Sequence, residues 1–170
     1  KECKNADADA VKFQMWRAED LYPSHPLFDK IKKTELSFKN AEKLKDFADS
    51  IGIEFFCSVF YPDAVDFLND IGVKKFKIAS RTCTLKDPLS IETLDSVNQT
   101  RKPVIVSMGM GGNRKFIEKS LSKNHLKFCY CISEYPLKIE KMNWNNAIKY
   151  DGLSDHTDGI VAPLLFSGLI

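Results

Sequence analysis

The sequence lacks the features that would direct the chain into a membrane or onto a nucleic acid. No apolar run approaches the roughly 20 residues that span a bilayer, and residues 1–5 contain no apolar core of a signal peptide. The 25 basic and 23 acidic residues nearly cancel, leaving a formal net charge of +2. We therefore expect neither a membrane nor a nucleic acid as a partner.

Cysteine is scarce and odd in number, which argues against a disulfide framework. The five cysteines mostly stand in apolar runs, as free thiols do in a reducing compartment, so we expect a cytoplasmic protein. Cys129 and Cys131 lie two residues apart on an expected strand and point to one face. They could clip a metal, but no second Cys/His pair stands at ligand spacing, and core packing is the favoured interpretation.

Several catalytic signatures are also missing. The chain contains no P-loop, no G-x-S-x-G nucleophile elbow and no Ser-His-Asp order. No G-x-G-x-x-G motif follows the first expected strand, which weakens a dinucleotide-binding interpretation. With 44% hydrophobic and 28% charged residues, the 170-residue chain suits one globular domain with a substantial core.

What the sequence does contain is a regular alternation of strand and helix patterns. Six short runs rich in β-branched and aromatic residues recur at an even interval, with helical periodicity between most of them. This alternation predicts βαβ units and a parallel sheet. The expected strands are Asp9–Gln14, Ile53–Val59, Lys75–Ser80, Val104–Met108, Lys127–Ser133 and Gly152–His156.

Several expected helices have recognisable ends. One begins after the cap Ser37 and stops at Gly52, and the next opens on Pro62 and stops at Gly72. Their periodicity predicts which side chains face the sheet. We expect Ala41, Leu44, Phe47, Ala48 and Ile51 on one face of the first helix, and Phe116, Ile117 and Leu121 facing inward from a later helix over Asn113–Leu121.

Two α/β folds compete for this pattern, an open doubly wound sheet and a closed barrel. Polar residues at the strand ends favour the barrel, because those ends converge on one mouth where catalytic groups lie. Six strands do not close an eight-stranded barrel. We therefore expect residues 1–170 to form an incomplete (β/α)₈ TIM barrel, with a first and a last strand outside the chain. The polar strand ends are Gln14, Ser58, Ser80, Ser107, Ser133 and His156.

Two lysines within apolar strands indicate an anion site. Lys12, which shares a strand face with Gln14, and Lys77 would be costly to bury unless an anion or a carboxylate meets them. Each could instead extend to solvent or pair with a buried acid. Because there are two, each followed by polar groups, the anion site is the better interpretation. Hydroxyl groups that could hold phosphate or carboxylate oxygens come from Ser58, Ser80, Ser107, Ser133 and Ser154.

The sharpest local motif is Leu153-Ser-Asp-His-Thr157. His156 follows a strand and is flanked by a carboxylate and hydroxyl groups. It could be a metal ligand, an acid–base group or a buried structural histidine. Spacing alone does not decide among these roles. Trp16 and Trp144 are expected to serve in packing.

Taken together, six segments in chain order resemble the N-acetylneuraminate (sialic acid) synthase family, which includes the legionaminic and pseudaminic acid synthases. The resemblance spans nearly the whole chain, and its segments are specific only in combination. They are Ala8-Asp-Ala-Val-Lys-Phe-Gln14, Phe56-Cys-Ser-Val-Phe60, Lys77-Ile-Ala-Ser80, Lys102-Pro-Val-Ile-Val-Ser-Met-Gly-Met110, Cys131-Ile-Ser-Glu-Tyr-Pro136 and Gly152-Leu-Ser-Asp-His-Thr-Asp-Gly159.

The resemblance implies a (β/α)₈ barrel transferase that condenses phosphoenolpyruvate with an N-acylamino sugar, using Mn²⁺ or Mg²⁺. It implies a homodimer and a C-terminal antifreeze-like domain in the full-length protein. Gln14 and Tyr135 would neighbour the sugar and, with Lys12 and Lys77, form the catalytic set; His156 would be a metal ligand. The phosphoenolpyruvate site would comprise Lys12, Ser58, Lys77, Ser80, Ser107, Ser133 and Ser154.

Two positions depart from the family pattern. Family members usually carry glycine where Arg81 stands and threonine where Met108 stands. Arg81 could strengthen the anion site or obstruct it. The two departures are the support for one alternative, a non-catalytic barrel that binds sugar phosphates. A second alternative, independent of them, is another phosphoenolpyruvate-dependent synthase that makes a 3-deoxy-aldulosonate.

Overall fold

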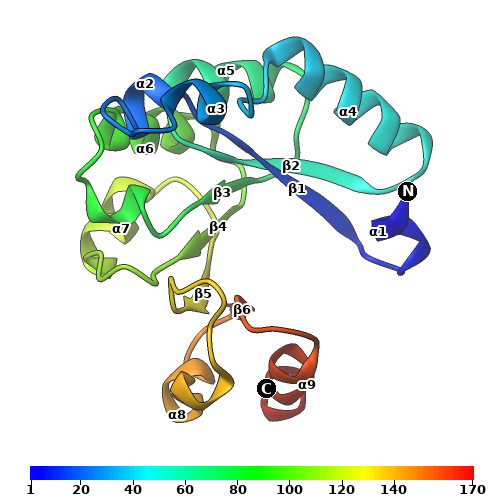
Figure 1. The fold of residues 1–170 in the computed structure, drawn as a ribbon, viewed down its shortest axis with the longest axis vertical. Coiled ribbons are helices and arrows are strands. Elements are labelled where there is room, and N and C mark those ends of the chain that lie inside the picture. Colours follow the sequence, from blue (N-terminus) through cyan, green and yellow to red (C-terminus); the bar gives the residue numbers. More distant parts are fainter.

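A single parallel sheet of six strands organises the computed structural model, which describes residues 1–170. Each strand pairs in parallel with the strand that precedes it in the chain. In Figure 1 the strands follow an open arc, with α1 near the N-terminus and α9 near the C-terminus at its two ends. The strands are β1 (Ala10–Met15), β2 (Glu54–Val59), β3 (Phe76–Ile78), β4 (Val104–Ser107), β5 (Leu126–Cys131) and β6 (Gly152–Ser154).

The helices between successive strands, α2 to α8, lie outside the arc, whereas α1 precedes β1 and α9 follows β6 (Figure 1). None of them combines the length and apolar character needed to cross a membrane. The helices are α1 (Glu2–Asn5), α2 (Ala18–Leu21), α3 (Phe28–Lys32), α4 (Phe38–Ser50), α5 (Pro62–Asp70), α6 (Ser90–Thr100), α7 (Arg114–Ser120), α8 (Trp144–Ala147) and α9 (Val161–Leu169).

The strand order decides between the two folds considered from the sequence. A doubly wound sheet reverses its strand order at a switch point, where its ligands bind. Here the order runs β1-β2-β3-β4-β5-β6 without a reversal. The prediction of an α/β fold of the barrel type is therefore confirmed as a six-stranded half-barrel.

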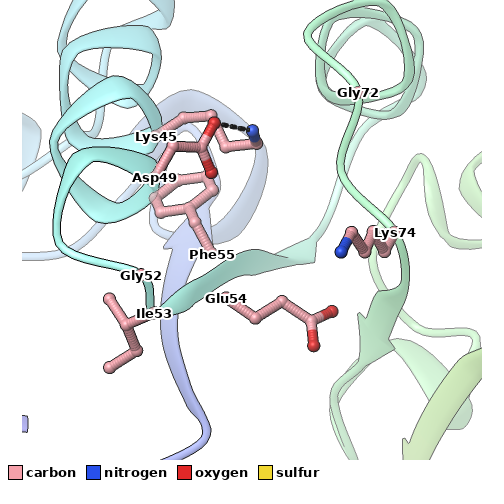
Figure 2. A pocket seen from close by; sticks show the side chains of 8 residues that line it. All are labelled: Lys45, Asp49, Gly52, Ile53, Glu54, Phe55, Gly72 and Lys74. Carbon is pink, nitrogen blue, oxygen red and sulfur yellow. Dashed lines mark hydrogen bonds and ion pairs between the residues drawn. The ribbon is translucent and has the colours of Figure 1, made fainter. Parts of the chain in front are cut away.

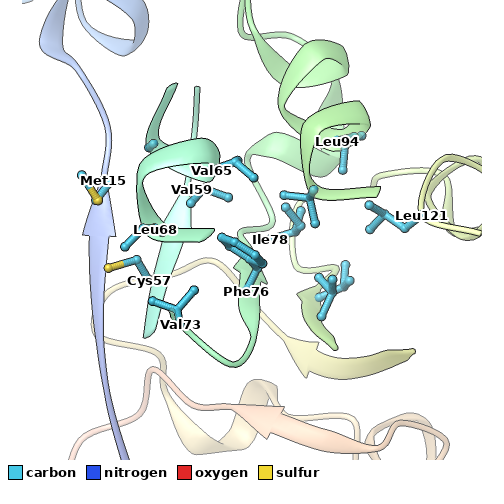
Figure 3. Close-up of a cluster of buried hydrophobic side chains, with 14 of the residues drawn as sticks. Met15, Cys57, Val59, Val65, Leu68, Val73, Phe76, Ile78, Leu94 and Leu121 are labelled. Carbon is cyan, nitrogen blue, oxygen red and sulfur yellow. The ribbon is translucent and has the colours of Figure 1, made fainter. Parts of the chain in front are cut away.

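The main core lies between the sheet and the helices, on the outer face of the arc. It contains 22 buried residues, including Phe55 and Cys57 of β2 and Phe76 and Ile78 of β3. Figure 3 shows the β3 side chains packed among those of α5 and its neighbours. Because strand side chains alternate between faces, the residues between these apolar ones point to the inner side of the arc. Lys77 is one of them.

The helix ends follow the expected local chemistry. The Ser37 Oγ accepts a hydrogen bond from the backbone N–H of Asn40 at 3.3 Å and caps α4. Pro62 stands in the first turn of α5. Gly52 and Gly72 follow α4 and α5 with φ angles of +68° and +79°, which glycine adopts without a steric penalty.

Two side chains expected on buried helix faces are exposed instead. Phe47 of α4 is 45% exposed and Phe116 of α7 is 38% exposed. Consecutive residues on an α-helix point about 100° apart, so only one of two neighbours can face the sheet squarely. Ala48 and Ile117 take that place and are buried, which leaves Phe47 and Phe116 on the flanks.

Candidate functional site

The carboxyl ends of the strands surround a hollow of about 590 Å³ on the inner side of the arc. Eighteen residues line it, and they include every residue predicted for the site from the sequence. Those predicted residues are Lys12, Gln14, Ser58, Lys77, Ser80, Ser107, Ser133, Tyr135, Ser154 and His156. The structure thus brings together side chains from all six strands and the loops that follow them.

Lys77 is the most buried charged residue of the hollow. Its side chain is only 7% exposed, and its Nζ donates hydrogen bonds to the Ser107 Oγ at 2.6 Å and the Ile78 carbonyl oxygen at 2.8 Å. Burial lowers the pKa of Lys77 to about 8. No carboxylate pairs with the ammonium among its hydrogen-bond partners. A buried cation whose partners are neutral oxygens favours an added anion.

Lys12 extends from the neighbouring part of the sheet into the same hollow. Its Nζ lies 3.4 Å from the Oγ of Ser58, which is itself buried. In the sheet register Gln14 stands beside Ser58, and Ser58 stands beside Lys77. The Lys12 side chain is accessible to solvent, yet the surrounding protein lowers its pKa by partial desolvation. The positive charge of Lys12 also contributes to the lowered pKa of Lys77.

The loops after β3, β4 and β5 meet closely beside these lysines. The Ser80 Oγ accepts a hydrogen bond from the Gly109 N–H at 2.9 Å and lies 3.6 Å from the Cys131 Sγ. A Cβ atom at Gly109 would stand 2.7 Å from that sulfur and 2.8 Å from the Ser133 Oγ. Only glycine therefore fits at position 109 without displacing the groups around it.

His156 is held in one orientation at the edge of the hollow. Its Nδ1 lies 2.8 Å from the carbonyl oxygen of Ile132, and because a carbonyl only accepts, Nδ1 carries the proton. The neutral ring then has its lone pair on Nε2. The ring also packs on Tyr135, with 4.2 Å between the centroids, while Tyr135 itself is 74% exposed.

The ligands for a metal are incomplete within residues 1–170. A proton on Nδ1, hydrogen-bonded to a carbonyl, is the usual arrangement for a histidine that binds a metal through Nε2. However, no group of three or more His, Cys, Asp or Glu side chains lies together in the chain. Cys129 and Cys131 do not form such a cluster, and Cys131 instead packs against the hollow.

The two departures from the family pattern have different surroundings. Arg81 lines the hollow, but its guanidinium is paired with Asp87, at 2.8 Å between Nη2 and Oδ1. Met108 packs against the main core and does not line the hollow; Met110 does. Of the two positions that the sequence placed beside the anion ligands, only Arg81 reaches the hollow.

Seven further residues that line the hollow were not considered for it from the sequence, whereas Arg81 was already placed beside the anion ligands. Four of the seven continue the inward-pointing series of the strands at a spacing of two: Trp16 follows Gln14, Phe60 follows Ser58, Ala79 follows Lys77, and Cys131 precedes Ser133. Extending those series would have found them. The other three, Leu21, Tyr22 and Met110, have no such signal.

A second hollow, of about 320 Å³, lies at the amino end of β2. Figure 2 shows its polar side chains, with Lys45 and Asp49 of α4 paired to each other. Glu54 pairs with Lys75 at 3.0 Å. Lys45, Asp49 and Glu54 thus already have partners, which leaves Lys74 as the one charged side chain of this hollow without an ion pair. Barrel enzymes place their chemistry at the opposite ends of the strands.

Comparisons with known proteins agree on one family. The NeuB family model matches residues 1–167. The chain is 38% identical over 97% of its length to the uncharacterized protein MJ1065 of Methanocaldococcus jannaschii, and 30% identical over 98% of its length to the N,N'-diacetyllegionaminic acid synthase of Legionella pneumophila. It covers 51% and 54% of these two proteins, so the chain spans about half the length of the curated relatives it matches.

The fold has a similar counterpart among solved structures. The N-acetylneuraminic acid (sialic acid) synthetase of Leptospira borgpetersenii, crystallised with citrate, superimposes with a TM-score of 0.84 at 28% sequence identity. The match covers 99% of this chain and 61% of that one. Similarity of fold and of sequence therefore extends over nearly all of residues 1–170.

Proposed function

The chain belongs to the NeuB family, and we propose that it carries the phosphoenolpyruvate site of a synthase that makes a sialic-acid-type nonulosonate. In the proposed reaction, phosphoenolpyruvate condenses with an N-acylamino sugar and phosphate is released. The named synthases among its relatives support an enzyme of this transferase type. The half-barrel supports a closed eight-stranded (β/α)₈ barrel in the complete enzyme, which we expect to act as a cytoplasmic homodimer.

The observation that carries this proposal is the buried Lys77 ammonium, which no carboxylate neutralises. Phosphoenolpyruvate brings a phosphate and a carboxylate, and the hollow offers two lysines to meet them. Hydroxyl groups of Ser58 and Ser107 already contact the two ammonium groups, so they can orient the same oxygens. Ser80, Ser133 and Ser154 also line the hollow, and we assign them to the remaining oxygens.

The proposed reaction requires no nucleophile from the protein. It requires protein groups that bind and neutralise the negative charges of phosphoenolpyruvate. Carbon 3 of phosphoenolpyruvate attacks the aldehyde carbon of the sugar, and the aldehyde oxygen takes a proton. Water then attacks the cationic carbon 2 and loses a proton. The carbon–oxygen bond to phosphate breaks as the new hydroxyl loses its own proton and becomes the ketone of the product. Lys12 and Lys77 stabilise the negative charge throughout, while Gln14 and Tyr135 stand at the open side, where the sugar would bind.

A divalent metal, Mn²⁺ or Mg²⁺, forms part of the proposal. The Nε2 lone pair of His156 is the nitrogen that would bind it, and a bound metal would supply Lewis acidity toward the aldehyde oxygen. One imidazole does not make a metal site, because residues 1–170 bring no cluster of three ligands together. We therefore assign no step of the reaction to the metal on the basis of these residues.

The decisive experiment measures phosphate release by the protein expressed from its complete gene. Phosphoenolpyruvate, Mn²⁺ and a panel of N-acylamino sugars are supplied to the wild type, to Lys77→Met and to Lys43→Met. Lys43 is an exposed lysine of α4 outside the hollow and serves as the matched control. We expect sugar-dependent release that Lys77→Met abolishes and Lys43→Met preserves.

Other outcomes would point to the alternatives. Release only with aldose phosphates lacking an acylamino group would identify a 3-deoxy-aldulosonate synthase. No release with any sugar, from a folded protein loaded with metal, would overturn the proposal in favour of a non-catalytic sugar-phosphate-binding barrel.

A further inference from the structure

Arg81 joins two loops at the rim of the hollow that are far apart in the sequence. Its Nε donates to the Asp87 Oδ1 and Oδ2 at 3.0 and 2.8 Å, and its Nη2 donates to Oδ1 at 2.8 Å. The same Nη2 donates to the Leu21 carbonyl oxygen at 2.8 Å. The guanidinium also lies over the Tyr22 ring, with Cζ 5.0 Å from the centroid. We call these contacts the Arg81 clasp.

The segment held by the clasp forms one wall of the hollow. Leu21 and Tyr22 line it, and Tyr22 meets Trp16 edge to face with 5.8 Å between the ring centroids. This wall (Trp16, Leu21 and Tyr22) contains no side chain that the proposed function assigns to phosphoenolpyruvate. Trp16 lies two residues beyond Gln14 along the direction of β1, which places it nearer the mouth.

The inner part of the hollow around Lys12, Lys77 and their serines, which we call the anion-binding floor, shares no side-chain hydrogen bond with the clasp. Ser80 directly precedes Arg81, but its hydroxyl is held separately by the Gly109 N–H at 2.9 Å. Lys77 and Ser107 bond to each other on adjacent strands, and neither contacts Asp87, Leu21 or the Arg81 guanidinium through a hydrogen bond. Arg81 itself stands four residues beyond Lys77, in the loop after β3. Releasing the clasp would therefore free the wall and leave the floor in place.

We propose that Arg81 is a positioning residue that holds the wall of Trp16, Leu21 and Tyr22 in place and thereby determines which acceptor sugar the hollow accepts. The inference rests on the proposed function, in which the lysines of the anion-binding floor hold phosphoenolpyruvate and the open side of the hollow takes the sugar. Asp87 neutralises the guanidinium with bidentate geometry, which suits a structural tie better than direct capture of a substrate anion.

Steady-state kinetics of the protein expressed from its complete gene test the inference, with substitutions of each partner of the Arg81–Asp87 pair. We expect Arg81→Ala and Asp87→Asn each to raise the KM for the acceptor sugar by about tenfold, since small displacements of positioning groups have effects of this order or larger. The KM for phosphoenolpyruvate should stay within about twofold of the wild type. The double variant should be no worse than either single variant, because both break one linkage.

The Asp87→Asn variant separates positioning from direct binding. If Arg81 instead bound the sugar, freeing its guanidinium would leave the acceptor KM unchanged or lower it, and the inference would fail. Arg81→Lys should restore only part of the acceptor affinity, since one ammonium cannot make the bidentate pair. Arg114→Ala, which breaks an exposed pair with Glu118 outside the hollow, is the matched control and should change neither KM.

A fluorescence measurement tests the wall without any turnover. The protein has two tryptophans, so a Trp144→Phe background reports Trp16 alone among residues 1–170. Should the complete gene encode further tryptophans, these are replaced by phenylalanine as well. We expect Arg81→Ala and Asp87→Asn to increase the quenching of Trp16 by acrylamide at unchanged thermal stability. Unaltered quenching in both variants would overturn the inference even if the enzyme proves active, whereas altered quenching in an inactive enzyme would count against the proposed function alone.

Discussion

The two faces of the sheet place very different demands on residues that are neighbours in the sequence. On β3, Phe76 and Ile78 are fully buried in the apolar core, while Lys77 between them points into the hollow with a hydroxyl and a carbonyl as partners. The outer face stabilises the fold by removing apolar area from water. The inner face buries a charge at a cost to stability, which a bound anion would offset. Substitutions at adjacent residues of β3 should therefore affect either the stability of the fold or the binding of an anion, depending on the face to which the side chain points.

The largest effect is expected on the outer face. Phe76→Ala leaves a cavity in a fully buried position and should lower the free energy of unfolding by about 3–5 kcal/mol, measured by urea denaturation. Phe116→Ala, at an exposed position of α7, is the control and should change it by less than about 1 kcal/mol. Equal losses in the two variants would contradict the division between the faces.

The adjacent inner-face variant should show the opposite behaviour. Lys77→Met removes charge-assisted contacts to the ligand and should weaken phosphoenolpyruvate binding by roughly 100-fold in calorimetry. The free energy of unfolding should stay constant or rise, because a buried ammonium is replaced by an apolar group of similar length. A large loss of stability with intact binding would reverse the assignment of this residue.

Two glycines in the loop after β4 allow a further test of the difference between the apolar core and the hollow. A Cβ at Gly112 would stand 2.4 Å from the carbonyl oxygen of Cys83, a core residue, so Gly112→Ala should cost about 1–3 kcal/mol of stability. Gly109→Ala instead crowds Cys131 and Ser133, which both line the hollow, and should weaken phosphoenolpyruvate binding in addition to any loss of stability. Gly168→Ala, where nothing lies within 4 Å, is the control. Equal changes in stability and in binding for the two variants would contradict the distinction between a core position and a position at the hollow.

The smallest expected effect is a pH dependence of phosphoenolpyruvate affinity, which should arise from Lys77 on the inner face of the sheet. Burial lowers the pKa of Lys77 to about 8, and only the charged form attracts a phosphate. The affinity for phosphoenolpyruvate should therefore fall about tenfold between pH 7 and 9. Lys77→Met should lose this decline, and a decline of equal size in that variant would rule out Lys77 as its source.

Whereas the affinity falls as the pH rises, the free energy of unfolding should increase with pH, over a higher range. Between about pH 8 and the unfolded value of 10.5, the unfolded chain still binds a proton that native Lys77 has lost. The free energy of unfolding then rises with pH relative to that of Lys77→Met. Urea denaturation of both proteins across this range measures the difference.

The parts of this architecture that depend on local periodicity were predictable from the sequence. Alternating strand residues place Lys12 and Gln14 on one face, and the same rule brings Ser58 and Lys77 beside them in the hollow. The caps Ser37 and Gly52 follow from backbone chemistry that involves only a few residues. These features need no knowledge of distant contacts.

The parts that depend on contacts between loops were not predictable. Arg81 and Leu21 are 60 residues apart, and nothing in either segment indicates that they bond to each other. The exposure of Phe47 and Phe116 likewise depends on how each helix rotates against the sheet, which is set by the shapes of the packed neighbours. Met108 and Met110 differ in the same way, since a two-residue step in a loop carries no fixed direction.

The consecutive pairing of the strands has a consequence for how the molecule forms. Every strand joins the one made immediately before it, so the sheet can grow in the order in which a ribosome delivers the chain. The hollow takes residues from each of the six units, and His156 is oriented by Ile132 at the last junction. The sheet can therefore form strand by strand, whereas the hollow gains its last lining residues, Ser154 and His156, only when β6 has been made.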